Sequence, residues 1–173
     1  INDNFGQEYG DFVLRKTADC ISGCLSEGQK VYKLVADEFL ILDVSSDKVR
    51  DAEKLYDKVR EAIDRFIEAN KFKVMYTVSG GIVPFGTLGG DQYSEALKLT
   101  DFALNEAKKL GRNRCYIFDR ETYRKFLRKR EITQELREAV NNGLQGFTAF
   151  YQPVFAEDKK VPYGAEALMR FAS

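Results

Sequence analysis

An acidic pair at the tip of an expected hairpin is the part of this sequence best suited to chemistry. Two β-rich runs, Val31–Val35 and Phe39–Val44, flank Ala36, Asp37 and Glu38, a pattern that predicts a hairpin with a tight tip. The turn would present both carboxylates, either to a ligand or simply to solvent. The sequence contains no histidine. Imidazole catalysis is therefore excluded, and oxygen ligands of the kind that Mg²⁺ prefers are the metal donors to expect.

The elements that would position this tip follow from the spacing of apolar residues. Steps of three and four predict helices at about 8–26, 47–70, 91–110 and 120–142, the last of them charged and sparse in apolar positions. Runs of β-branched and aromatic residues predict further strands at 73–78, 115–118, 148–155 and 163–171. The paired Gly80 and Gly81 indicate a bulge or a close backbone approach. This order predicts an α/β (α+β) fold whose mainly antiparallel central sheet is flanked by helices.

Composition and charge narrow the classes of function. Hydrophobic residues make up 44% and charged residues 31% of the 173 residues, with 27 basic and 27 acidic side chains, as in ordinary folded domains. A net charge of zero gives no basic footprint for nucleic acid or for an anionic membrane surface. The sequence also lacks an apolar run of about 18 residues and a signal-peptide pattern. We expect a cytoplasmic fragment without membrane contact, whose parent protein could still be anchored through upstream segments.

The three cysteines, Cys20, Cys24 and Cys115, do not form a zinc-type cluster. Cys20 and Cys24 are four residues apart within a predicted helix, so they fit one apolar face better than a disulfide. We expect all three to be reduced and packed.

Several motifs, in order, resemble the bacterial GGDEF family of diguanylate cyclase-like domains. The run 107–114 (AKKLGRNR) is almost identical to that family's Ala-Lys-x-x-Gly-Arg-Asn-Arg segment, and 33–39 (KLVADEF) falls where the family carries its glycine-glycine-acid-Glu-Phe hairpin. Asn2 and the Gly10-Asp11 pair match two further motifs. The resemblance covers about 1–119 and implies a nucleotidyl-cyclase-like fold. In the family this fold opens with a central strand, which would precede Ile1 and is expected to be missing here.

The resemblance also implies roles for four nucleotide-binding residues. Asn2 and Asp11 would recognise guanine, whose O6, N7, N1–H and N2–H groups complement an amide and a carboxylate. Lys108 and Arg112 would contact the triphosphate. Each has a structural alternative, namely a turn asparagine, an aspartate at a helix start, and cations at the negative end of a helix dipole. Asp37 would be a weak Mg²⁺ ligand, because the family's other metal carboxylate comes from the first strand.

The hairpin motif departs from the family where catalysis depends on it. Val35 and Ala36 replace two glycines that let the backbone approach the nucleotide and adopt torsions disfavoured by a β-carbon. We therefore expect the degenerate motif Val35, Ala36, Asp37, Glu38 and Phe39 to be catalytically inactive. The family's inhibitory Arg-x-x-Asp would fall at 26–29, where the sequence reads SEGQ.

The C-terminal residues resemble the start of an EAL cyclic-di-GMP phosphodiesterase domain. Tyr151-Gln152-Pro153 and the run 164–170 (GAEALMR) carry this likeness, which implies a metal-ligand position for Glu166 and a substrate-associated position for Arg170. One carboxylate cannot assemble a two-metal hydrolytic site, so we expect no phosphodiesterase activity from this chain. Its isolated strand pair should expose apolar surface. Two look-alike runs, at 89–93 and 95–97, lie at the start of a predicted helix and are interpreted as structural.

Together these features predict a cyclic-di-GMP signalling fragment with three parts: a degenerate GGDEF domain at 1–119, a linker helix at 120–144 and the beginning of an EAL domain at 145–173. The GGDEF domain would regulate the EAL domain of the same polypeptide, with GTP and accompanying Mg²⁺ as candidate ligands and no cofactor required for folding. One alternative is an active cyclase that condenses two GTP molecules across a homodimer. Another is a purely structural or dimerisation module.

Overall fold

The computed structural model describes residues 6–69, 75–89, 92–157 and 160–172. The chain forms two compact units, Ile1–Phe118 and Asp119–Ser173. In the first unit the elements are α2 (Gln7–Cys24), β1 (Gln29–Lys33), β2 (Phe39–Asp43), α3 (Val49–Ala69), β3 (Gly80–Ile82), the 3-10 turn η1 (Phe85–Thr87), α4 (Gln92–Lys109) and β4 (Cys115–Ile117). This mixture of helices and small sheets confirms the predicted α/β class.

The predicted hairpin is present as β1 and β2. The two strands pair antiparallel in an unbroken register from Gln29 opposite Asp43 to Lys33 opposite Phe39. A hydrogen bond from the Val44 N–H to the Gly28 carbonyl, 3.0 Å long, extends the pairing beyond the open end. Residues 34–38 therefore form a tip held by a regular two-stranded ladder.

The second sheet of this unit is parallel and uses fewer residues than the sequence pattern predicts. β3 pairs with β4 from Gly80 opposite Cys115 to Ile82 opposite Ile117. The strand predicted at 73–78 is wrong for residues 75–78, which are not in a strand, and residues 73 and 74 lie outside the described part. The Val78 carbonyl instead accepts a hydrogen bond of 2.9 Å from the Tyr56 hydroxyl. A side-chain donor thus satisfies this backbone group in place of a neighbouring strand.

The close backbone approach expected at the paired glycines is confirmed at Gly81. A β-carbon built there would lie 2.5 Å from the Leu104 backbone nitrogen and 2.9 Å from the Thr100 carbonyl oxygen of α4. Only a residue without a β-carbon lets β3 lie this close to the helix. Gly81 therefore sets the spacing between the parallel sheet and α4.

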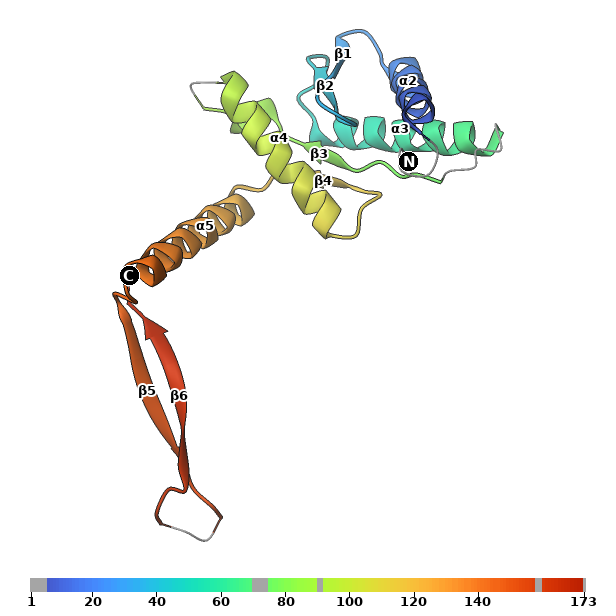
Figure 1. The fold of residues 1–173 in the computed structure, drawn as a ribbon. Coiled ribbons are helices and arrows are strands. Elements are labelled where there is room, and N and C mark those ends of the chain that lie inside the picture. Colours follow the sequence, from blue (N-terminus) through green and yellow to red (C-terminus); the bar gives the residue numbers. More distant parts are fainter. Residues whose placement is uncertain (1–5, 70–74, 90–91, 158–159, 173) are drawn as a thin grey trace. The chain divides into compact units, whose positions relative to one another are not determined.

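Two groups of apolar side chains hold the first unit together. Figure 1 shows α2 across α3 with the β1–β2 hairpin beside them, and the core between these elements contains Ile21, Cys24, Val59, Ile63 and Ile67. The second group lies where α4 packs on β3 and β4, and its buried members are Leu99, Phe102, Ala103, Ala107 and Phe118. The hairpin and α4 are thus fixed by different parts of the core.

The three cysteines are free thiols, as predicted. Cys24 is 4% exposed within the core, and its thiol lies 3.6 Å from the Lys58 carbonyl oxygen. Burial raises the pKa of Cys20 and of Cys115 above that of an ordinary thiol. They behave as small packed side chains rather than as nucleophiles.

The second unit contains α5 (Arg120–Asn141), β5 (Phe147–Val154) and β6 (Gly164–Phe171). Asp119 caps the helix, because its carboxylate accepts a hydrogen bond of 2.7 Å from the Thr122 N–H. β5 and β6 pair antiparallel from Phe147 opposite Phe171 to Val154 opposite Gly164. All three elements begin and end within a residue of the predicted bounds. None of the helices in the described part of the chain combines the length and the apolar character of a membrane span.

Candidate nucleotide site

The tip of the β1–β2 hairpin is a closed turn in spite of its substitutions. The Leu34 N–H donates to the Glu38 carbonyl at 3.0 Å, and the Glu38 N–H donates to the Val35 carbonyl at 3.1 Å. Ala36 has a φ of 51°, in the left-handed region where the glycine it replaces would be at ease. The expectation that a β-carbon would deny the tip this torsion is therefore wrong at Ala36. Its methyl group is exposed, so only the intrinsic cost of about 1–2 kcal/mol remains.

A lysine that sequence analysis did not single out supports this turn. The Lys33 ammonium donates hydrogen bonds to the carbonyls of Ala36 and, at 3.4 Å, Leu34. The same ammonium lies 5.1 Å from the centroid of the Phe39 ring, opposite Lys33 in the ladder. Carbonyl oxygens and a ring face are both attractive to a cation. Lys33 thereby stabilises a tip that Ala36 would otherwise strain.

The structure brings the hairpin and the end of α4 together. The Lys108 ammonium lies 3.8 Å from a carboxylate oxygen of Glu38, and the two side chains are 42% and 38% exposed. Two motifs far apart in the sequence thus meet at one place. Lys108 is also in the last turn of α4, where a cation is favoured by the helix dipole, so its structural and its ligand-binding interpretations are compatible.

The loop after α4 presents Arg112 to solvent in an unusual backbone conformation. Gly111, Arg112 and Asn113 have φ values of 113°, 59° and 50°. The Arg112 N–H donates to the Ala107 carbonyl at 3.2 Å, which closes the helix end in the manner of a left-handed cap. Arg112 is exposed. Backbone bonds fix where its chain leaves the helix, while the guanidinium stays accessible to an anion.

The predicted guanine-binding residues are only partly described. Asp11 lies in the second turn of α2 and is exposed, as a residue that meets a ligand would be. Asn2 lies outside the described residues. Their assignment to guanine stays a prediction.

The acidic tip is not a metal site by itself. Asp37 is exposed, and Glu38 faces Lys108 rather than a second carboxylate. Within the parts of the chain that the structure describes, no group of three or more histidine, cysteine, aspartate or glutamate residues could hold a metal ion. The assignment of Asp37 as a weak Mg²⁺ ligand stays a prediction.

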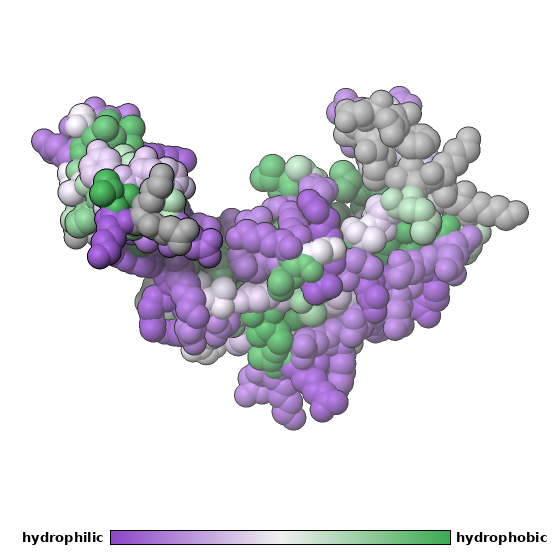
Figure 2. Space-filling view, turned by 90° about the horizontal axis from the view of Figure 1, so that it is seen from below, coloured by the Kyte–Doolittle hydropathy of each residue, from purple (hydrophilic) through white to green (hydrophobic). Residues whose placement is uncertain are grey.

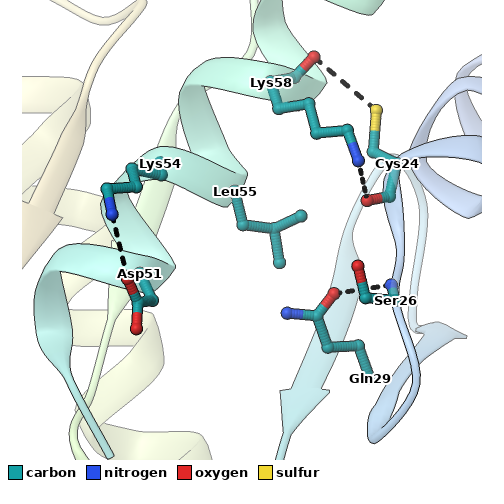
Figure 3. Close-up of a pocket in the computed structure, with 7 residues that line it drawn as sticks. All are labelled: Cys24, Ser26, Gln29, Asp51, Lys54, Leu55 and Lys58. Carbon is teal, nitrogen blue, oxygen red and sulfur yellow. Dashed lines mark hydrogen bonds and ion pairs between the residues drawn. The ribbon is translucent and has the colours of Figure 1, made fainter. Parts of the chain in front are cut away.

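A shallow pocket of about 170 Å³ lies elsewhere, between α3 and the segment that joins α2 to β1. Figure 3 shows Ser26 and Gln29 on one side of it and Asp51, Lys54 and Leu55 on the other. Ser26 and Gln29 are the first and last residues of the 26–29 segment, where the family's Arg-x-x-Asp would fall. Here the amide oxygen of Gln29 accepts a 2.8 Å hydrogen bond from the Ser26 N–H, and its amide nitrogen donates to Asp43 at 2.8 Å. The replacement residues bind one another.

Asp43, which accepts the hydrogen bond from Gln29, is held in its charged form. Partial burial by itself would raise the pKa of Asp43, but hydrogen bonds from the Ser45 hydroxyl and N–H and from the Gln29 amide outweigh that effect. The net result is a pKa below the ordinary aspartate value. The negative charge is thus part of the local structure, and the pocket offers no free pair of arginine and aspartate.

In the second unit, Glu166 and Arg170 lie on β6, opposite Gln152 and Thr148 of β5. Residues two and four apart in a strand share a face, so Gln152, Glu166 and Arg170 lie on one side of this hairpin. Glu166 is exposed. The assignment of Glu166 to a metal-ligand position stays a prediction.

Of the two look-alike runs, one can be judged from the described residues. Glu95 is in the first turn of α4, and its carboxylate accepts a hydrogen bond from the Gly89 N–H. It stabilises the start of a helix, as interpreted from the sequence. Residues 90 and 91 of the other run lie outside the described part.

The family is decided by a match over most of the first unit. The model described as "Diguanylate cyclase, GGDEF domain" matches residues 1–114. The chain belongs to the GGDEF family. Its hairpin tip and the end of α4 are therefore this member's versions of the motifs recognised in the sequence.

Relatives of this chain include much longer proteins. Over 99% of its length it is 27% identical to a protein named cyclic di-GMP phosphodiesterase NbdA and 25% identical to one named bifunctional diguanylate cyclase/cyclic di-GMP phosphodiesterase MucR, both from Pseudomonas aeruginosa. It covers 21% and 24% of those proteins. It is also 29% identical, over 68% of its length, to the Escherichia coli diguanylate cyclase DosC, of which it covers 25%. The chain thus spans a fifth to a quarter of these relatives.

Solved structures support the fold. The GGDEF domain of TpbB (YfiN) from Pseudomonas aeruginosa superposes with a TM-score of 0.60 at 23% identity, covering 73% of this chain and 74% of that one. The active GGEEF domain of a Vibrio cholerae diguanylate cyclase gives a TM-score of 0.51 at 26% identity, covering 69% and 75%. Both likenesses are consistent with the arrangement of helices and strands described above.

Proposed function

We propose that this chain is a non-cyclising GGDEF domain of a cyclic-di-GMP signalling protein, which binds GTP and regulates an adjoining EAL phosphodiesterase domain. The observation that carries this proposal is the meeting of the substituted hairpin tip with Lys108 at the end of α4. In this arrangement Lys108 is kept as a cation that could bind a phosphate chain. The hairpin tip, which in the family performs the chemistry, is altered.

The tip argues against cyclisation. Val35 is 79% exposed and, with the methyl group of Ala36, occupies space on the surface that a glycine pair would leave free for the nucleotide. Among the described residues, Asp37 is not part of a group of three or more side chains that could hold a metal ion. Activation of a ribose hydroxyl and neutralisation of the leaving pyrophosphate would both lack their usual support. Catalysis is therefore the property most affected by the substitutions.

Binding of GTP can persist without catalysis, because it uses other residues. Lys108 and Arg112 would pair with the phosphates through charge-assisted hydrogen bonds. Asp11 would select guanine by accepting hydrogen bonds from its N–H groups. Asn2, which lies outside the described residues, would donate a hydrogen bond to an acceptor atom of the same base. No protein-held metal is required in this scheme, and any Mg²⁺ would come with the triphosphate.

The regulatory role rests on the domain organisation, which we assign as the GGDEF domain at 1–119, the linker helix at 120–144 and the EAL start at 145–173. Support comes from NbdA and MucR, whose names include cyclic di-GMP phosphodiesterase and whose similarity extends over 99% of this chain. Helix α5 follows the GGDEF domain directly and leads to the strand pair with Glu166 and Arg170. A change in the GGDEF domain could thus be passed along one continuous helix.

Calorimetry with GTP and Mg²⁺ on the intact chain, followed by an assay for cyclic-di-GMP, tests the proposal. We expect saturable heat, no product, and loss of binding in Asp11→Ala. Asp64→Ala, which removes an exposed carboxylate of α3, serves as the matched control and should bind normally. Product formation would refute the non-cyclising assignment, and absence of GTP binding would leave only a structural module.

A further inference from the structure

The ion pair between the hairpin and α4 places an anion of the protein itself at a proposed phosphate site. A Glu38 carboxylate oxygen lies 3.8 Å from the Lys108 ammonium. This inference rests on the proposed function, which assigns Lys108 to the phosphate chain. A single ammonium cannot pair fully with both a carboxylate and a phosphate in the same direction, because its attraction for each depends on close approach.

We propose that Glu38 is a built-in competitor for phosphate at Lys108, so that ligand binding releases the hairpin from α4. The pair is partly exposed, with 42% and 38% of the two side chains accessible. Such pairs contribute little to stability, and the contact is therefore easily displaced. The carboxylate is nonetheless close enough to reduce the affinity of a ligand that needs the same cation.

The competition also selects a class of ligand. A phosphate monoester has a single phosphoryl group, so it can replace Glu38 at Lys108 but gains no second cation in return. A triphosphate carries several negative charges and can contact Lys108 and the accessible Arg112 beyond the end of the helix together. Displacement of Glu38 is thus favoured for polyphosphates over monophosphates.

The rest of the tip does not depend on the contact between Glu38 and Lys108 for its fold. Backbone bonds between Leu34, Val35 and Glu38 close the turn, and the Lys33 ammonium binds two of its carbonyls. None of these bonds involves Lys108. Phosphate binding would therefore break the contact between the tip and α4 without unfolding the tip, and this gives the domain a local, ligand-dependent change at its surface.

Calorimetry of the intact chain with inorganic triphosphate, in the absence of Mg²⁺, tests the competition. Glu38→Gln should bind triphosphate about 1.5- to 5-fold more tightly than the unmodified chain, the range expected when an exposed ion pair no longer has to be broken. Lys108→Gln should bind at least several-fold more weakly. Asp37→Asn is the matched control, because it removes the same charge from the same turn without removing the contact to Lys108, and its affinity should change less.

A second measurement needs no ligand. Replacement of Glu38 by Gln, of Lys108 by Gln, and of both should give non-additive changes in hydrogen exchange of the Leu34 amide, because either change alone removes the same contact. Additive changes would overturn the inference, as would unchanged or weaker triphosphate binding by Glu38→Gln, an equal gain in Asp37→Asn, or no triphosphate binding by any variant. The expected triphosphate pattern without GTP binding would sustain this inference and reject the proposed function.

Discussion

Ala36 shows how a residue can keep a backbone conformation that its side chain disfavours. Its φ of 51° is tolerated because its methyl group is exposed and because Lys33 binds the carbonyls around it. The two substitutions at this tip therefore change the space available to a ligand without changing the path of the chain. For the proposed non-cyclising function, obstruction of the nucleotide is therefore a better explanation than loss of the turn.

Ala36→Gly should stabilise the chain by about 0.5–1 kcal/mol, because relief of the left-handed strain exceeds the added flexibility of the unfolded state. Denaturant unfolding with a linear extrapolation would measure the change. Ala18→Gly, in the interior of α2, makes the same chemical change in a helix and should destabilise by about 1 kcal/mol. Equal destabilisation by both substitutions would show that Ala36 is not strained.

At the scale of elements, α4 links the parallel strands β3 and β4 to the tip of the β1–β2 hairpin. Its middle, from Thr100 to Leu104, lies on the parallel strands, where Gly81 lets the backbones approach, and its C-terminal end carries Lys108 to Glu38. The position of Lys108 relative to the hairpin therefore depends on how closely β3 packs against this helix. A change at that contact should affect both stability and the site.

Gly81→Ala should destabilise the first unit by about 1–3 kcal/mol or more, since its β-carbon would meet the backbone of α4 rather than a side chain that can move. It should also weaken triphosphate binding by displacing Lys108. The control is Gly86→Ala in η1, where a β-carbon would meet nothing within 4 Å. Thermal or denaturant unfolding distinguishes the two, and a Gly81→Ala chain as stable as the control would contradict the packing argument.

At the scale of the whole molecule, the chain combines a domain that has a core with a strand pair that has none of its own. Phe150, Tyr151 and Met169 of β5 and β6 are 58%, 70% and 58% exposed, and apolar side chains, green in Figure 2, reach the surface among the hydrophilic ones. A two-stranded hairpin is marginal by itself. Exposed apolar strands of this kind favour association with other polypeptide segments.

We expect the 173-residue chain to bind a hydrophobic dye and to self-associate as its concentration rises, because both faces of the β5–β6 hairpin carry exposed apolar groups. Phe150→Thr combined with Met169→Thr should reduce both effects while keeping residues suited to strands. Sedimentation velocity and dye fluorescence would measure them. Val44→Thr removes a single apolar side chain that is 69% exposed in the first unit and should have little effect. Monomeric behaviour at all concentrations would contradict the expectation.

Local patterns predicted much of this protein. Apolar spacing predicted the four long helices that the structure describes, and β-rich runs around a short polar tip predicted the β1–β2 hairpin, because these signals depend on residues close in sequence. Ordered motifs such as the run 107–114 also indicated the GGDEF family, which the family match confirms.

Other features depended on contacts between residues far apart in sequence. The parallel pairing of β3 with β4, the closeness of Gly81 to α4 and the meeting of Glu38 with Lys108 could not be derived from local spacing. The left-handed torsion of Ala36 was missed as well, since its stabilisation by Lys33 depends on where the folded turn places that side chain. The sequence by itself thus determined the long helices, the two hairpins and the family. The tertiary structure decided how the altered hairpin keeps its shape and which cation it faces, because packing and charge act through space.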